Sequence, residues 1–151
     1  MDIIAIDPGK VTGVAWISAG SDHPVTHEIP GGILGFVEWW NDHGGRVDYI
    51  LIEDWMVRPN TYKMTPQPDA YLIIGYMQGK CIENGVPLMK IGPSSHKSFN
   101  GKGEKMKTRR LGWGERSKDN HHEDACSVLL LGMTRCDTQR AHALLKEIVN
   151  D

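Results

Sequence analysis

The fold is decided by a stretch near the start of the chain, IIAIDPGKVTGVAWI (residues 3–17). Its first half is an apolar run that ends in one carboxylate, Asp7, and its second half is again mostly apolar. The Pro-Gly pair between the halves is a strong turn signal, so the stretch predicts two strands that pair back on each other. Asp7 then lies at the tip of the first strand. By itself it is also a common turn residue, because its side chain can accept hydrogen bonds from nearby backbone amides.

The rest of the chain alternates between strand-like and helix-like segments. We expect strands at 2–7, 11–18, 25–29, 48–53 and 88–91, and helices at 31–43, about 69–84, about 121–135 and 138–149. The first three strands follow one another without a helix, whereas each later strand is followed by one. This order predicts an α/β fold: a five-stranded mixed sheet, its first three strands antiparallel, with helices on both faces. In the first helix, the apolar side should be formed by Ile33, Leu34, Val37 and Trp40.

Composition limits the class of protein. A chain of 151 residues predicts a single domain, 1–151. No apolar run approaches the roughly 20 residues that cross a bilayer, and the N-terminus lacks a signal-like stretch, so we expect no membrane association. The three cysteines show no metal-type spacing, and their odd number argues against a disulfide framework. These features indicate a reducing, cytoplasmic setting. Cys81 and Cys126 are expected to be small buried residues.

Two later segments can bring acidic side chains to the same place as Asp7. Glu53 ends the apolar run YILIE (49–53), and Asp124 lies in the first turn of the expected helix HHEDACSVLLL (121–131). Close carboxylates raise one another's pKa, and a hard divalent cation removes that difficulty. Mg²⁺, with Mn²⁺ as a substitute, is therefore the expected cofactor, and two such ions about 3.5–4 Å apart could promote phosphodiester hydrolysis. His121 lies three positions before Asp124 and so shares its helix face.

Neighbouring polar residues have ordinary structural interpretations. Glu123 is three residues after Asn120, which favours an N-terminal helix cap. Asp54 should point to the opposite face of the strand from Glu53, toward solvent or a local ion pair. His122 is expected at the surface, although a shifted register would place it, instead of His121, beside the acids.

Positive charge is concentrated in one part of the chain, the basic segment (residues 94–118). It contains eight basic and two acidic residues, whereas the rest contains nine basic and seventeen acidic residues. Such a distribution is typical of a phosphate-binding surface, and equally of a solvated, mobile loop. The basic residues are Lys97, Lys102, Lys105, Lys107, Arg109, Arg110, Arg116 and Lys118.

Together these motifs resemble the RuvC-like Holliday junction resolvases of the RNase H-like superfamily. The matching segments are IDPG (6–9) with Thr12-Gly13, Ile52-Glu53, GYMQG (75–79), PSSHKSFNGKG (93–103) and His121-x-x-Asp124-Ala125. The resemblance implies an RNase H-like fold and an Mg²⁺-dependent endonuclease that cleaves branched DNA, either Holliday junctions or flaps and forks. It also implies a homodimer. The implied catalytic and metal-binding residues are Asp7, Glu53, His121 and Asp124, and the implied DNA-binding residues are Lys97, Lys102, Lys105, Lys107, Arg109, Arg110 and Trp55.

The sequence departs from the family at one position. Relatives place an aromatic side chain shortly after the second acid, to stack on bases near the branch point. Here Met56 is the aligned residue, and Trp55, its neighbour, is the residue that could stack on unpaired bases. Many relatives also have an acid where this chain has His121, which could ligate a metal or move a proton.

The helix expected at about 69–84 carries several apolar residues that could serve either the core or a dimer surface. They are Tyr71, Leu72, Ile74, Tyr76 and Met77. A short family member of this kind fits a bacterial cytoplasm, and it also fits a bacteriophage genome as its source.

Two other classes of protein remain as alternatives. A sugar kinase or actin-like ATPase also opens with an acid in a strand–turn–strand, but needs two such lobes, which 151 residues cannot supply. A non-catalytic module could bind branched DNA through the basic segment. The three acids argue against it, because a pure binding module has no reason to place carboxylates near phosphates.

Overall fold

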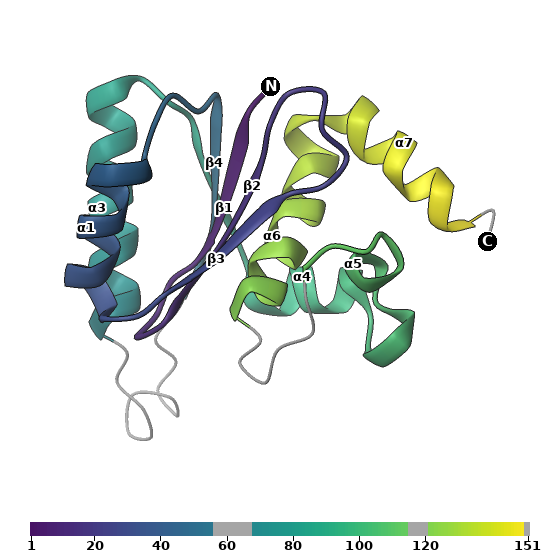
Figure 1. Cartoon of the computed structure of the whole chain (residues 1–151), viewed down its shortest axis with the longest axis horizontal. Helices are drawn as coiled ribbons and strands as arrows, with labels where there is room; N and C mark the ends of the chain where they lie inside the picture. The colour runs from purple at the N-terminus through teal and green to yellow at the C-terminus, as the bar shows by residue number, and fades with distance from the viewer. Residues whose placement is uncertain (56–67, 115–120, 150–151) are drawn as a thin grey trace.

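A mixed β-sheet forms the centre of the molecule (Figure 1). The computed structural model describes residues 1–55, 68–114 and 121–149. Five strands follow the spatial order β3-β2-β1-β4-β5, in which β1, β2 and β3 are antiparallel and β1, β4 and β5 are parallel. The strands are β1 (Ile3–Asp7), β2 (Thr12–Ile17), β3 (Val25–Ile29), β4 (Tyr49–Glu53) and β5 (Leu88–Ile91). The predicted α/β architecture with its mixed sheet is confirmed.

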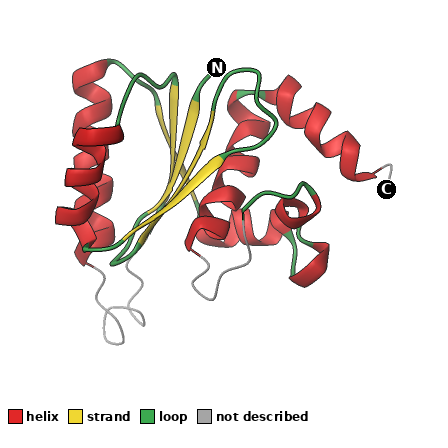
Figure 2. Ribbon diagram, viewed as in Figure 1, coloured by secondary structure: helices red, strands yellow, loops and turns green. Residues whose placement is uncertain are grey.

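Helices cover both faces of this sheet (Figure 2). One face is covered by α1 (Gly32–His43) and α3 (Pro68–Asn84). On the other side lie α4 (Pro93–Asn100), η1 (Gly103–Lys105), α5 (Lys107–Arg110), α6 (His121–Cys136) and α7 (Thr138–Val149). Within the described ranges, none of these helices combines the length and the apolar character that a membrane span requires.

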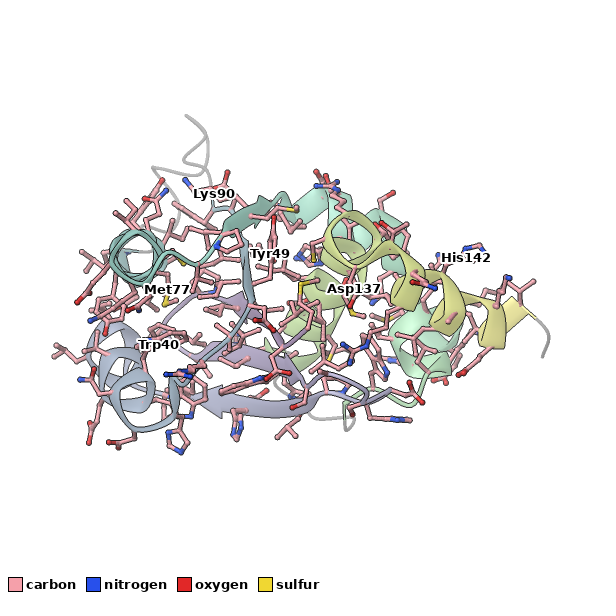
Figure 3. The ribbon with its side chains drawn as sticks, turned by 90° about the horizontal axis from the view of Figure 1, so that it is seen from above. Trp40, Tyr49, Met77, Lys90, Asp137 and His142 are labelled. Carbon is pink, nitrogen blue, oxygen red and sulfur yellow. The ribbon has the colours of Figure 1, made fainter. Side chains whose placement is uncertain are left out.

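The strand β1 contributes to two hydrophobic cores because its side chains alternate between the faces of the sheet. Ile3 and Ala5 belong to the core beneath α6, and Ile4 and Ile6 to the core beneath α1 and α3. All four are fully buried. Figure 3 shows the sheet from above, between its two helical layers. A strand buried on both faces explains why the opening sequence is continuously apolar.

One local expectation is wrong, and one of the two alternatives for the basic segment does not hold over its described part. Leu34 is 80% exposed, because the buried stripe of α1 follows Gly32, Phe36 and Trp40 at four-residue intervals. The basic segment is not simply a solvated loop, since α4, η1 and α5 lie within it and both α4 and α5 pack against α6. The buried positions expected for Cys81 and Cys126 are confirmed.

Candidate active site

Asp7 and Glu53 lie side by side at one end of the sheet. They are the last residues of β1 and β4, which run parallel with Ile6 opposite Ile52. Parallel strands bring their carboxyl ends to the same edge, so both carboxylates are directed to that end. Each residue is only 8% exposed. The sheet alone therefore places two acids next to each other.

The beginning of α6 reaches the same place because Gly13 has no side chain. Gly13 pairs with Asp7 across β1 and β2. A Cβ atom at Gly13 would lie 2.0 Å from the carbonyl oxygen of His121, which is impossible for any other residue without a shift of the helix. The glycine thus allows the first turn of α6 to lie directly over the beginning of β2, opposite Asp7. This close approach brings His121 and Asp124 to the carboxylates.

The predicted residues line a single pocket. The pocket has a volume of about 640 Å³, and all four predicted site residues contribute to its wall. His121 Nδ1 lies 3.9 Å from Asp7 Oδ2. The side chains in the wall with charge or metal-binding potential are Asp7, Lys10, Glu53, Asp69, Lys97, His121 and Asp124. Three separate parts of the chain therefore converge as the sequence predicted.

Burial and mutual repulsion make the carboxylates less acidic than usual. Burial, with the nearby charges of Glu53 and Asp124, raises the pKa of Asp7 to about 6, although the neighbouring imidazole of His121 opposes this. Burial and the charge of Glu53 also raise the pKa of Asp124, while Lys97 opposes the rise. The pKa of His121 is raised mainly by its polar contact with the carboxylate of Asp7. A cation in the pocket would relieve the repulsion between the acids.

The chemistry of these donors suits a hard divalent cation. Carboxylate oxygens are the ligands that Mg²⁺ and Mn²⁺ prefer, and an imidazole nitrogen is compatible with Mn²⁺. Within residues 1–55, 68–114 and 121–149, however, no three such groups are already gathered closely enough to hold one ion. The side chains of Asp7, Glu53 and Asp124 would have to turn toward a shared ion. All three lie at the ends of ordered elements and line one pocket.

A buried histidine that the sequence analysis did not select holds Glu53. His96 is fully buried, and its Nε2–H donates to Glu53 Oε2 at 2.6 Å. Its Nδ1 lies 2.9 Å from the hydroxyl oxygen of Ser127, and that hydroxyl donates to the carbonyl oxygen of His96. His96 was quoted only as part of a basic motif. The spacing between it and Glu53 gives no sequence signal, because the contact joins residues 43 apart.

Two expectations for the first turn of α6 are corrected by their contacts. His122 is not a surface residue: it is 5% exposed, and its Nδ1 lies 2.8 Å from Glu28 Oε1. Glu123 is also buried, and it accepts a hydrogen bond at 2.9 Å from Nε of Arg109. An ion pair thus accounts for its position, while Asn120, its expected capping partner, lies outside the described residues. His121, rather than His122, lines the pocket.

The predicted DNA-binding residues fall into two groups. Lys97 is exposed and lines the pocket. Lys102 and Lys105, which follow within eight residues of the sequence, are also exposed. The others have partners within the protein. Lys107 donates to the carbonyl oxygen of Phe99, Arg109 to Glu123, and Arg110 to the carbonyl oxygen of Ile148.

Trp55, the residue that could stack on bases, lies in the wall of the pocket, and its role in DNA binding stays a prediction. Its ring contacts that of Tyr71 edge to face, with centroids 4.9 Å apart. Tyr71 itself is 40% exposed. Met56, the residue aligned with the family's aromatic position, lies outside the described residues, as do Arg116 and Lys118.

Comparison with known proteins identifies the fold. No protein-family model and no curated protein sequence matches the chain. Among solved structures, RuvC of Thermus thermophilus in complex with a Holliday junction substrate matches with a TM-score of 0.61 and 17% identity, over 97% of this chain and 94% of RuvC. The fowlpox virus Holliday junction resolvase matches with a TM-score of 0.57 and 10% identity, over 90% and 99% of the two chains.

A third match is the yeast mitochondrial Holliday junction resolvase Ydc2, with a TM-score of 0.52, 14% identity and coverage of 96% of this chain and 80% of Ydc2. Each likeness extends over nearly the whole of this chain. The predicted resemblance to RuvC-like resolvases is therefore confirmed at the level of the fold.

Proposed function

We propose that this chain is a metal-dependent endonuclease that cleaves branched DNA, with the four-way junction as its substrate. One observation carries the proposal: the three acids and His121, from three separate elements, line one pocket together with the exposed cation of Lys97. The likeness to three resolvases supports it, because it covers nearly all of the chain. A phosphodiester that enters the pocket would meet both the carboxylates and Lys97.

The proposed chemistry divides the work among the pocket residues. Two Mg²⁺ or Mn²⁺ ions, when bound, would lower the pKa of a water and stabilise the leaving oxygen. Asp7, Glu53 and Asp124 would supply the oxygen ligands, and His121 could complete the set or accept the proton of the attacking water. Lys97 would hold a non-bridging phosphate oxygen. Lys102 and Lys105 would contact the backbone of the DNA arms.

We also propose that two copies of the chain act together. The exposed face of α3 carries Leu72, 53% exposed, and Ile82, 83% exposed. Between them lie Gly75 and Gly79, over each of which a Cβ atom would meet nothing within 4 Å. An apolar face with small residues at its centre allows two helices to approach closely. A two-fold dimer would also match the near two-fold symmetry of a four-way junction.

The experiment is a cleavage assay on labelled four-way junction, flap, fork and linear duplex of matched length, each with Mg²⁺, Mn²⁺ or EDTA. We expect cleavage of the junction with either metal and none in EDTA. Cleavage that continues in EDTA would refute metal dependence, and a preference for linear duplex would refute the proposed substrate.

A non-catalytic module that binds branched DNA is the second candidate, and the basic segment favours it. In the same assay that protein would shift the mobility of the junction but leave the strands intact under every metal condition. Intact strands with Mg²⁺ and Mn²⁺, at concentrations that saturate binding, would decide for this candidate.

A further inference from the structure

Glu53 is held differently from the other two acids of the pocket. Its Oε2 atom accepts a hydrogen bond from His96 at 2.6 Å, and the imidazole is fully buried. Hydrogen bonds of this length between a nitrogen and a carboxylate are the strong, charge-assisted kind. One of the two oxygens of Glu53 is therefore committed to the protein interior, and the other oxygen is left for a ligand in the pocket.

The His96 ring cannot turn easily, because Ser127 holds its opposite edge. Nδ1 lies 2.9 Å from the Ser127 hydroxyl oxygen, and the same hydroxyl donates to the backbone carbonyl of His96 at 3.1 Å. Ser127 is itself 2% exposed and belongs to α6, whereas His96 belongs to α4. The hydrogen-bonded series Ser127–His96–Glu53 thus joins two helices to the end of β4. The imidazole at its centre is fully buried from solvent.

The number of oxygens that a carboxylate offers affects which ion it selects. Ca²⁺ takes six to eight oxygen ligands and commonly binds a carboxylate through both oxygens. Mg²⁺ is smaller and requires near-octahedral geometry with single-oxygen contacts, and Mn²⁺ suits the same oxygen donors. A carboxylate with one oxygen committed elsewhere therefore favours the smaller ions over Ca²⁺.

From these contacts we infer that His96 is a positioning residue that makes Glu53 a one-oxygen ligand, and that it thereby biases the pocket toward small divalent cations. The inference rests on the proposed function, because it assumes that Glu53 binds a metal. Removing partners of metal-binding side chains typically weakens metal affinity 10- to 100-fold. The effect of His96 should therefore be measurable in the binding of the metal alone, without DNA.

The test measures Mn²⁺ binding to the whole chain by electron paramagnetic resonance of the free ion, with Ca²⁺ as the competitor. His96→Met removes the donor but keeps much of the side-chain volume, and we expect about 10- to 100-fold weaker Mn²⁺ binding. The ratio of Mn²⁺ to Ca²⁺ affinity should also fall, because Glu53 could then offer both oxygens. His96→Gln retains an N–H donor near the position of Nε2 and should recover part of both values.

Two further variants separate positioning from a general loss of structure. His142→Gln changes an exposed histidine on α7 (Figure 3) that is not among the residues lining the pocket, and it should leave both values unchanged. Ser127→Ala keeps the His96–Glu53 contact but releases the ring, and should give a smaller loss in the same direction. If His96→Met fails to give a cooperative thermal transition, Ser127→Ala takes its place in the test.

The outcomes distinguish the two proposals. If the wild-type chain binds no Mn²⁺, the proposed function and this inference both fail. If the wild type binds Mn²⁺ but folded His96→Met or Ser127→Ala keeps its affinity and its Mn²⁺ to Ca²⁺ ratio within twofold, only the role of His96 is refuted. A loss of affinity with an unchanged ratio, not recovered in His96→Gln, would also refute it.

Discussion

The carbonyl oxygen of His121 lies 2.0 Å from the position that a Cβ atom on Gly13 would occupy. Gly13 pairs with Asp7 in the sheet, and His121 Nδ1 lies 3.9 Å from Asp7 Oδ2. The missing side chain of one residue therefore sets the distance between two groups of the pocket. The Thr12-Gly13 motif is a weak signal in the sequence, but in the structure Gly13 leaves the space that the backbone of His121 occupies.

Replacing this glycine should separate the helix from the sheet. In Gly13→Ala the methyl group would clash with backbone atoms, which cannot rotate away, so α6 must shift. We expect a loss of about 1–3 kcal/mol in the free energy of unfolding, as in other overpacked sites, together with a loss of junction cleavage. Urea unfolding and the cleavage assay measure the two effects.

Gly45→Ala is the matched control for this change. Gly45 is exposed in the segment between α1 and β4, and a Cβ added there would meet its nearest atoms only at 3.8 and 3.9 Å, which is ordinary van der Waals contact, so the substitution should leave cleavage unchanged and should not destabilise the fold. Equal stability of Gly13→Ala and the wild type would show that α6 does not depend on this contact.

The buried carboxylate of Asp7 should destabilise the metal-free protein at neutral pH. Its pKa is raised from 3.8 to about 6 by burial, so the folded state holds the proton more tightly than the unfolded state. The stability from protonated Asp7 is then complete below about pH 4 and is lost as the pH rises through 6. We expect Asp7→Asn in EDTA to be more stable than the wild type at pH 7.5, by up to about 3 kcal/mol.

Urea unfolding of both proteins at pH 4 and pH 7.5 measures this difference. The advantage of Asp7→Asn should shrink toward pH 4, where the wild-type side chain is itself neutral. Lower stability of Asp7→Asn at pH 7.5 would show that the carboxylate is well compensated in the absence of metal.

The two groups of basic residues should respond differently to neutralisation. Lys102 and Lys105 are exposed, so their joint replacement by Gln should lower the slope of log affinity against log salt by about 2, with no change in the unfolding midpoint. Arg109→Gln should lower the unfolding midpoint, because it leaves Glu123 buried without its cation. Fluorescence anisotropy with labelled junction and thermal unfolding give the two values. An unchanged salt slope in the double variant would show that these lysines do not touch DNA.

A charge on the exposed face of α3 should prevent dimer formation. Leu72→Glu places a carboxylate on that face without disturbing the core, since Leu72 is 53% exposed. We expect a monomer in sedimentation equilibrium that still unfolds cooperatively. Val149→Glu is the control, because Val149 is 80% exposed and belongs to α7, which lies on the other side of the sheet from α3 (Figure 1). A Leu72→Glu variant that remains dimeric would place the interface elsewhere.

Much of the fold was predictable because its strands have strong local patterns. β1 and β4 are buried on both faces and read as continuous apolar runs, and the Pro-Gly turn fixes the pairing of β1 with β2. Asp7 ends β1 and Glu53 ends β4, and because these strands are parallel, the sequence predicted that the two acids would lie close together. The grouping of these two with His121 and Asp124 on one pocket agrees with that prediction, while their binding of a metal remains a proposal.

The errors at His122, His96 and Glu123 share a physical cause, because each depends on a contact between residues far apart in the sequence. His122 looked like a surface residue until Glu28, 94 positions away, was placed beside it. The role of His96 follows only from its contact with Glu53, and the ion pair of Glu123 only from the fold of the basic segment. Local sequence patterns carry no information about such partners.

The proposed activity requires the carboxylate of Asp7 as a metal ligand, so the decisive experiment compares Asp7→Asn with the wild type on a labelled four-way junction in Mg²⁺, at protein concentrations that saturate binding. We expect the cleavage rate to fall by about a thousandfold or more, since a lost metal ligand removes several kcal/mol of transition-state stabilisation. Junction affinity in EDTA should stay within about twofold of the wild type. Cleavage by Asp7→Asn within tenfold of the wild-type rate would mean that the chemistry takes place without this pocket.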